Sequence, residues 1–274
     1  MRIEDRVKNG AAGSTRSSIL VPRSIVISGA SSGIGLALAR HYIERGATVA
    51  AFARRGDLLQ TLAAEFPDKV YCYTLDVRDA PAIQRAAIDF MSRVGIPDIV
   101  IANAGVSRGT LTEYVEDEAV FQSVMDTNVL GMVKTFQPFH AVMREAKRGT
   151  LVGIASVAGF RGLPGSGAYS ASKAAAITYL ESLRVELYGS GVKVVTICPG
   201  YIRTPMTDVN TYPMPFILEA EEAARRMARV IERGTSFAVV PWQMGWAGWL
   251  LKRLPNWIYD PAFSKAPHKS RGDQ

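Results

Sequence analysis

Short runs of consecutive apolar residues alternate with amphipathic stretches along most of this chain. The runs are apolar at nearly every position rather than at every second one, which is typical of strands covered on both faces. The stretches between them have the spacing and length of helices. We therefore predict an α/β fold: a single-domain, doubly wound sheet of about seven parallel strands with helices on both faces. The predicted strands lie at 24–30, 47–55, 69–77, 97–105, 149–156, 192–200 and 236–241.

This alternation fills residues 23–241 without an internal linker or repeat, so we expect one domain there. Residues 1–22 are polar and charged and lack the apolar segment of a signal peptide, which predicts a flexible N-terminal extension. Residues 242–274 form a C-terminal tail that carries all four tryptophans of the chain, with Lys252 and Arg253 among them. We expect the tail to pack on the domain, on a partner subunit or on a membrane surface, where tryptophan and basic side chains are favoured.

The composition narrows the range of functions. The formal net charge is +7, but the basic residues are scattered and form no block, so nucleic-acid binding is not expected. No apolar run reaches the ~20 residues that a membrane span needs. Cys72 and Cys198 lie inside apolar stretches, which predicts buried free thiols and a reducing, cytoplasmic location. The C-terminal tail leaves peripheral contact with the inner face of a membrane as an alternative.

The segment SGASSGIG, at 28–35, follows the first apolar run and opens the first predicted helix. Glycine permits a tight turn and lets a phosphate approach the backbone, while the helix start offers unpaired N–H groups and the positive end of the helix dipole. A plain glycine-rich turn is the alternative. We expect the turn to bind the pyrophosphate of a dinucleotide. The predicted contacts are Gly29, Ser31, Ser32, Gly33, Ile34 and Gly35.

Two arginines, Arg54 and Arg55, end the second predicted strand, and no acidic residue lies between Thr48 and Gly56. An acidic residue there would bind the ribose hydroxyls of NAD(H), whereas a guanidinium group suits the ribose phosphate of NADP(H). A solvated basic loop is the alternative. The residues therefore favour NADP(H) over NAD(H) as the cofactor.

Tyr169 and Lys173 lie four residues apart in GAYSASKAAA, with only small residues between them. Positions i and i+4 share one face of a helix, and a nearby ammonium group lowers the pKa of a phenol, which is ordinarily near 10. A phenol tuned in this way can exchange a proton with a carbonyl oxygen. Alone, the pair also fits an ordinary surface helix. Ser156 and Asn103 end two predicted strands and Asn128 lies in the predicted helix at 116–147, so we expect these polar residues nearby.

Together these motifs resemble the short-chain dehydrogenase/reductase family, over roughly 24–240. The resemblance implies a Rossmann-like fold, a nicotinamide cofactor and no metal. The motifs that carry it, in order, are SGASSGIG at 28–35, Asp76–Val77, Asn103–Gly105, Ser156 with YSASK at 169–173, and PGYIRT at 199–204.

The resemblance also implies roles for single residues. Tyr169 is the general acid in reduction and the base in oxidation, and Lys173 lowers its pKa and binds the nicotinamide ribose. Ser156 binds the substrate oxygen, and Asn128 holds a water that connects Lys173 to solvent. The implied cofactor contacts are Asp76, Val77, Asn103, Ala104, Gly105, Tyr169, Lys173, Pro199, Gly200, Ile202 and Thr204.

Three positions depart from the family's pattern. Ser28 replaces the usual threonine, and Ala102 replaces the first asparagine of the usual Asn-Asn-Ala-Gly motif. Ser32 stands where a basic residue is one sign of NADP(H) in the family, so only Arg54 and Arg55 support that cofactor.

We therefore predict an NADP(H)-dependent oxidoreductase that interconverts a carbonyl and a secondary alcohol, with reduction favoured. The segment at 205–222 is rich in methionine, proline and aromatic residues and is expected to close over an apolar or amphipathic substrate. The family implies a homodimer or homotetramer. The alternatives are a non-catalytic NADP(H)-binding sensor and a membrane-associated scaffold. The four residues Asn128, Ser156, Tyr169 and Lys173 argue against a sensor, which needs none of them.

Overall fold

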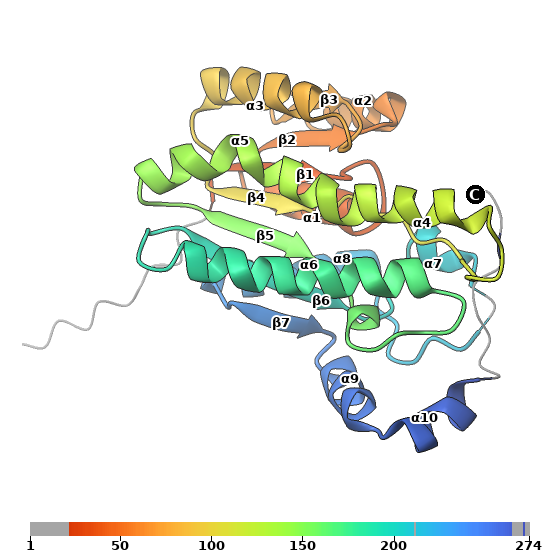
Figure 1. The fold of residues 1–274 in the computed structure, drawn as a ribbon. Helices are drawn as coiled ribbons and strands as arrows, with labels where there is room; N and C mark the ends of the chain where they lie inside the picture. The colour runs from red at the N-terminus through yellow and green to blue at the C-terminus, as the bar shows by residue number, and fades with distance from the viewer. Residues whose placement is uncertain (1–21, 211, 265–270, 272–274) are drawn as a thin grey trace, which may run out of the picture.

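The computed structural model describes residues 22–210, 212–264 and 271, so the extension predicted at 1–22 lies, but for Pro22, outside the described residues. One sheet holds seven strands in the order β3-β2-β1-β4-β5-β6-β7 (Figure 1). All neighbouring strands are parallel, which confirms the predicted doubly wound sheet. The strands are β1 Ser24–Ser28, β2 Thr48–Ala53, β3 Val70–Thr74, β4 Ile99–Ala102, β5 Thr150–Ile154, β6 Lys193–Pro199 and β7 Phe237–Val240.

Helices cover both faces of this sheet (Figure 1). Successive strand residues point to opposite faces, so Ile25 and Ile27 of β1 pack in one core and Val26 in the other. The first core includes residues of α1, α2 and α8, and the second includes residues of α3, α5 and α6. The helices are α1 Gly33–Glu44, α2 Gly56–Glu65, α3 Ala80–Val94, α4 Asp117–Met125, α5 Gly131–Glu145, α6 Gly167–Glu186, α7 Pro205–Asp208, α8 Ala220–Arg233, α9 Gln243–Arg253 and α10 Asn256–Phe263.

The helix predicted at 116–147 is interrupted. A π-helical turn, Asp126–Leu130, separates α4 from α5. Such turns widen the helix by one residue and often occur at functional sites. Asn128 lies within this turn and is completely buried, so the irregular backbone is what places its side chain.

The strand order reverses between β1 and β4. From β1 the sheet extends through β2 and β3 on one side, and from β4 it extends to β7 on the other. In open parallel sheets, ligands bind outside the carboxyl ends of the strands at this point. Gly29 directly follows β1 and Asn103 directly follows β4, so both lie where a ligand is expected.

Two further helices, α9 and α10, follow the edge strand β7 and project from the body of the domain (Figure 1). α9 contacts β7 and the short 3-10 turn Val157–Gly159 that follows β5. Within the described residues, no helix has both the length and the apolar character that crossing a bilayer requires.

Candidate active site

A cleft runs along the carboxyl ends of the strands, from the end of β2 to the start of α6. It brings together residues that the sequence places far apart. Of the predicted site residues, those that line it are Gly29, Ser31, Ser32, Gly33, Ile34, Arg54, Arg55, Asp76, Val77, Asn103, Ala104, Gly105, Ser156, Tyr169, Lys173, Pro199, Gly200, Ile202 and Thr204. Gly35 and Asn128 do not line the cleft. They contact residues that do.

The glycine turn is fixed by contacts that leave no space for side chains. Gly29 has a φ of +71°, and a Cβ there would lie 2.8 Å from the Cα of Ala104. A Cβ at Gly35 would lie 2.3 Å from the carbonyl oxygen of Gly29. The hydroxyl of Ser28 accepts hydrogen bonds from the N–H groups of Asn103 and Ala104, each at 3.2 Å. The Ser28 hydroxyl therefore makes the contacts with the residues after β4 that a threonine hydroxyl could also make. Gly35 allows the turn to pack closely against Gly29.

The start of α1 fits the phosphates of a dinucleotide. Within the described chain, no side chain caps this helix and its first turn holds no acidic residue, so its N–H groups are left for an anion. Arg55 donates to the hydroxyl oxygens of Ser31 at 3.0 Å and Ser32 at 2.6 Å. A guanidinium group thus lies directly at the edge of the turn. Arg54 lines the same cleft.

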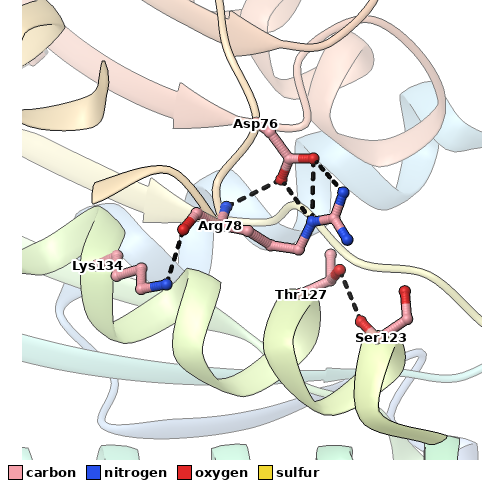
Figure 2. Close-up of polar contacts among 5 residues, drawn as sticks. All are labelled: Asp76, Arg78, Ser123, Thr127 and Lys134. Atoms are coloured by element: carbon pink, nitrogen blue, oxygen red, sulfur yellow. Dashed lines mark hydrogen bonds and ion pairs between the residues drawn. The ribbon is translucent and has the colours of Figure 1, made fainter. Parts of the chain in front are cut away.

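Asp76 is held by a neighbour that the sequence analysis did not single out. Arg78 donates from Nε and Nη2 to the carboxylate of Asp76, at 2.7–3.1 Å, and its backbone N–H donates to the same group at 2.9 Å (Figure 2). The Arg78 side chain holds the pKa of Asp76 below its ordinary value. Lys134 of α5 donates to the carbonyl oxygen of Arg78 at 2.7 Å, which ties this edge of the cleft to the helix layer (Figure 2).

Ser156, Tyr169 and Lys173 meet at the opposite end of the cleft. Ser156 follows β5 and begins the 3-10 turn, where its hydroxyl accepts from the N–H of Ala158 at 3.1 Å. This hydroxyl lies near the Tyr169 phenol and lowers its pKa. Lys173 lies one turn along α6 and is only 4% exposed. Its ammonium group donates to the carbonyl oxygen of Ile154 at 2.9 Å and lies 5.8 Å from the centre of the Tyr169 ring.

Burial dominates the pKa values of this group. It lowers the pKa of Lys173 from 10.5 to about 8. Burial raises the pKa of Tyr169, and the neighbouring Ser156 hydroxyl only partly opposes this. The Tyr169 pKa is therefore above its ordinary value in this structure, because burial of the phenol outweighs the influence of its neighbours. The spacing of two residues on a helix does not reveal how deeply they are buried.

Asn128 lies behind the cleft and fixes its wall. Its amide group donates to the carbonyl oxygen of Val106 and to the hydroxyl of Ser172, each at 2.9 Å, and its Oδ1 accepts from the N–H of Val106 at 2.8 Å. A Cβ at Gly105 would lie 3.2 Å from Oδ1 of Asn128 and 3.5 Å from Nζ of Lys173. The missing side chain of Gly105 thus leaves a narrow space between these two polar groups.

Sequence reasoning missed part of the lining. Most of these residues are apolar and have no pattern that separates them from core residues. Thr207, in the segment predicted to close over the substrate, forms a capping box with Thr204 at the start of α7, and such boxes have a recognisable spacing. Met244 of α9 packs against Gly200, where a Cβ would lie 2.6 Å from the Met244 Cγ. The lining residues that were not predicted are Ala53, Leu75, Thr127, Ile154 and Ala155, whereas Pro205, Met206 and Thr207 belong to the segment at 205–222 that was expected to close over the substrate.

Known proteins resemble this chain in sequence and in fold. A family model described as short chain dehydrogenase matches residues 23–213. An uncharacterized oxidoreductase of Myxococcus xanthus is 41% identical over 243 residues, which are 88% of this chain and 96% of that protein. A solved short-chain dehydrogenase from Streptomyces avermitilis has a TM-score of 0.73 and 27% identity, covering 89% of this chain and 99% of that one. A solved serine dehydrogenase complexed with NADP+ has a TM-score of 0.71 and 28% identity, covering 76% of this chain and 88% of that one.

Proposed function

Because this chain belongs to the short-chain dehydrogenase family, we propose that it is an NADP(H)-dependent reductase that converts a carbonyl compound to a secondary alcohol. The observation that carries the proposal is the Tyr169 phenol, which lies beside Ser156 and the buried Lys173 in one cleft with the glycine turn. A non-catalytic sensor would need the turn but not this group.

The chain's own residues handle the proton of the reaction. A bound nicotinamide dinucleotide supplies or accepts the hydride. Ser156 binds the carbonyl oxygen, and Tyr169 donates its proton to the same oxygen. Burial raises the pKa of Tyr169, so the phenol holds its proton at neutral pH. This is the form that reduction requires.

Lys173 stabilises the phenolate that remains after Tyr169 has given up its proton. Because the ammonium lies 5.8 Å from the ring centre in a site of low dielectric, its attraction for the phenolate is stronger than in water. The pKa of Lys173, about 8, also lets it pass a proton to the phenolate near neutral pH. The space beside Gly105 is the route by which a proton would reach Lys173, and Asn128 forms its other side.

The preference for NADP(H) is supported by Arg55. Its guanidinium group is held by Ser31 and Ser32 at the edge of the glycine turn, where a phosphate on the adenine ribose would lie. A guanidinium–phosphate pair is strong and directional. The solved relative that contains NADP+ adds support from outside this chain.

The substrate side is apolar. Met206 lines the cleft at the start of α7, and Tyr201 packs edge to face against Tyr212, with ring centres 6.4 Å apart. Phe216 is 55% exposed in the same segment. These side chains support an apolar or amphipathic substrate. The free thiols Cys72 and Cys198 support a reducing compartment such as the cytoplasm, and we extend the proposal to a homodimer or homotetramer.

The test is loss of reduced-cofactor absorbance over a panel of ketones, aldehydes and acyl-thioester ketones, with NADPH and NADH side by side. Turnover with NADPH well above NADH is expected. Tyr169→Phe should lower kcat by about 10²–10⁴-fold while cofactor affinity, measured by titration, stays within about twofold. Tyr179→Phe, on the same helix and outside the cleft lining, is the matched control. Tight cofactor binding without turnover of any substrate would favour the sensor, and a fully active Tyr169→Phe would refute the mechanism.

A further inference from the structure

The C-terminal helices carry an unusual set of exposed apolar side chains. Trp242, Trp246, Trp249 and Arg253 are spaced to share one face of α9, and the Arg253 guanidinium lies 4.1 Å from the centre of the Trp249 ring. Each side chain of the set is between 39% and 76% exposed. We call this set the tryptophan surface, and its members are Trp242, Trp246, Trp249, Leu250, Trp257 and Ile258.

The opposite side of these helices is fixed to the catalytic domain. Gly248 packs on Phe160, where a Cβ would lie 2.3 Å from the ring. Arg161 donates to the carbonyl oxygens of Leu251 and Leu254 and to the side chain of Asn256. The domain therefore holds these helices in place by their other side. The side chains of the tryptophan surface stay exposed and are not covered by the domain.

These contacts also connect the surface to the active site. Tyr259 of α10 donates to the carbonyl oxygen of Gly162 at 2.7 Å, and its ring lies 3.8 Å from the Arg161 guanidinium carbon. Phe160, Arg161 and Gly162 follow the turn that Ser156 begins. The tryptophan surface thus lies on the same side of the molecule as the substrate end of the cleft.

The charge around the surface favours an anionic partner. Lys252 and Arg253 are exposed at the end of α9, and that helix contains no acidic residue. In α10 the only acidic residue is Asp260. A two-fold interface would bring the basic residues of one copy close to those of the other, which is unfavourable. An anionic lipid surface pairs with them instead, and tryptophan prefers the interface between lipid and water.

We propose that the tryptophan surface docks this protein on an anionic lipid bilayer, with the indole rings among the headgroups and Lys252 and Arg253 on the lipid charges. Several tryptophan side chains that stay exposed on two consecutive helices are typical of an interaction site. Docking in this way places the substrate end of the cleft beside the lipid, and that consequence rests on the proposed function. The docking itself does not depend on it.

The test uses the full chain with vesicles of phosphatidylcholine alone, or with about 40 mol% phosphatidylglycerol. All four tryptophans of the chain belong to this surface, so tryptophan emission reports on it alone. We expect co-sedimentation with the anionic vesicles, a blue-shifted emission, quenching by brominated lipid, and binding that weakens with salt. Trp246→Ala combined with Trp257→Ala should weaken partitioning by about tenfold or more.

Matched variants separate docking from unfolding and from self-association. Tyr188→Ala removes an aromatic side chain that is 90% exposed beyond the far end of α6 and should leave vesicle binding unchanged. Lys252→Glu with Arg253→Glu should abolish the preference for anionic vesicles, whereas Arg144→Glu with Lys147→Glu should not. All variants should keep wild-type turnover without lipid. The proposal is overturned if the tryptophan variant binds as the wild type does. It is also overturned if emission shifts with protein concentration in the absence of lipid and sedimentation shows a dimer, because the occupant is then a second copy.

Discussion

The two ends of this molecule that flank the cleft are built by different means. At the cofactor end, backbone atoms contact one another directly, as where Gly35 lies against the carbonyl oxygen of Gly29. At the C-terminal end, long side chains such as Arg161 and Tyr259 hold two helices to the domain. The backbone contacts at the cofactor end allow only glycine or small residues at fixed positions, so a short sequence motif predicts them. The contacts at the C-terminal end join side chains that are far apart in the sequence, and no motif predicts those.

The largest effect is expected when one carbon atom is added at the cofactor end, where the backbone contacts leave no space for it. Gly35→Ala places a Cβ at 2.3 Å from the Gly29 oxygen and 2.5 Å from Asn103 Nδ2. The turn and β4 must then separate, and we expect a loss of about 2–4 kcal/mol in the free energy of unfolding. Cofactor affinity should fall by more than about a hundredfold, because the N–H groups of α1 lose their positions. Urea unfolding and cofactor titration measure the two effects.

Gly167→Ala is the control for this substitution, since a Cβ at Gly167 meets no atom within 4 Å in the described residues. That variant should unfold and bind cofactor as the wild type does. If Gly35→Ala also behaved as wild type, the cofactor end would be more adaptable than its contacts indicate, and the distinction between the two ends would fail.

A smaller effect on cofactor binding is expected when the Arg55 side chain, which contacts the glycine turn, is removed. Arg55→Ala should raise the KM for NADPH by about tenfold or more and leave the KM for NADH nearly unchanged, because a charged hydrogen bond to the ribose phosphate is lost. Steady-state kinetics with both cofactors measure this. Arg40→Ala removes an arginine that pairs with Glu65 at 2.6 Å and is absent from the cleft lining, so it should change neither value. Equal increases for both cofactors would show that Arg55 only supports the turn.

The fold was predictable in nearly all of its parts because the signals are local. Fully apolar runs identify buried parallel strands. Gly29 and Asn103 directly follow the ends of two of them, and Ser156 lies two residues after the end of a third. Burial and irregular backbone were not predictable. The π-helical turn around Asn128 has no sequence period of its own, and the upward shift of the Tyr169 pKa depends on how deeply α6 packs. Arg78 lies only two residues from Asp76, but the motif at Asp76–Val77 does not include it (Figure 2).

The buried Lys173 gives a dependence on pH. Its pKa is about 8, so raising the pH through this value removes the ammonium that stabilises the Tyr169 phenolate. We expect the rate of carbonyl reduction to fall above about pH 8, by up to tenfold per pH unit. Turnover at saturating NADPH, measured from pH 6 to about 10, checks this. A rate that stays constant over this range would show that the charge of Lys173 is not needed.

Lys173 also makes the free energy of unfolding depend on pH. In the unfolded chain Lys173 has its ordinary pKa of 10.5, so between about pH 8 and 10.5 the unfolded state binds more protons. The contribution of Lys173 to the free energy of unfolding therefore rises with pH in this window, and its burial is most costly below about pH 8. Lys173→Met should be more stable than the wild type at pH 7, and this advantage should shrink toward pH 10.5. Urea midpoints at several pH values test it.

The smallest effect, and the one that probes the C-terminal end, is expected from Arg161→Ala. The carbonyl oxygens of Leu251 and Leu254 lose their donor, and Tyr259 loses the guanidinium over its ring. We expect a loss of about 1–3 kcal/mol in the free energy of unfolding and a KM for the carbonyl substrate raised by roughly two- to fivefold. The KM for NADPH should not change, because the cofactor end does not contact Arg161.

Arg93→Ala is the matched control for Arg161→Ala. Arg93 also lies over an aromatic ring, that of Tyr71, and pairs with Asp89, but it is exposed and lies on α3, away from the substrate end. Arg93→Ala should leave the free energy of unfolding and both KM values nearly unchanged. If Arg161→Ala raised the KM for NADPH as much as that for the carbonyl substrate, the C-terminal helices would support the whole cleft. The separation between a backbone-built cofactor end and a side-chain-built substrate end would then be wrong.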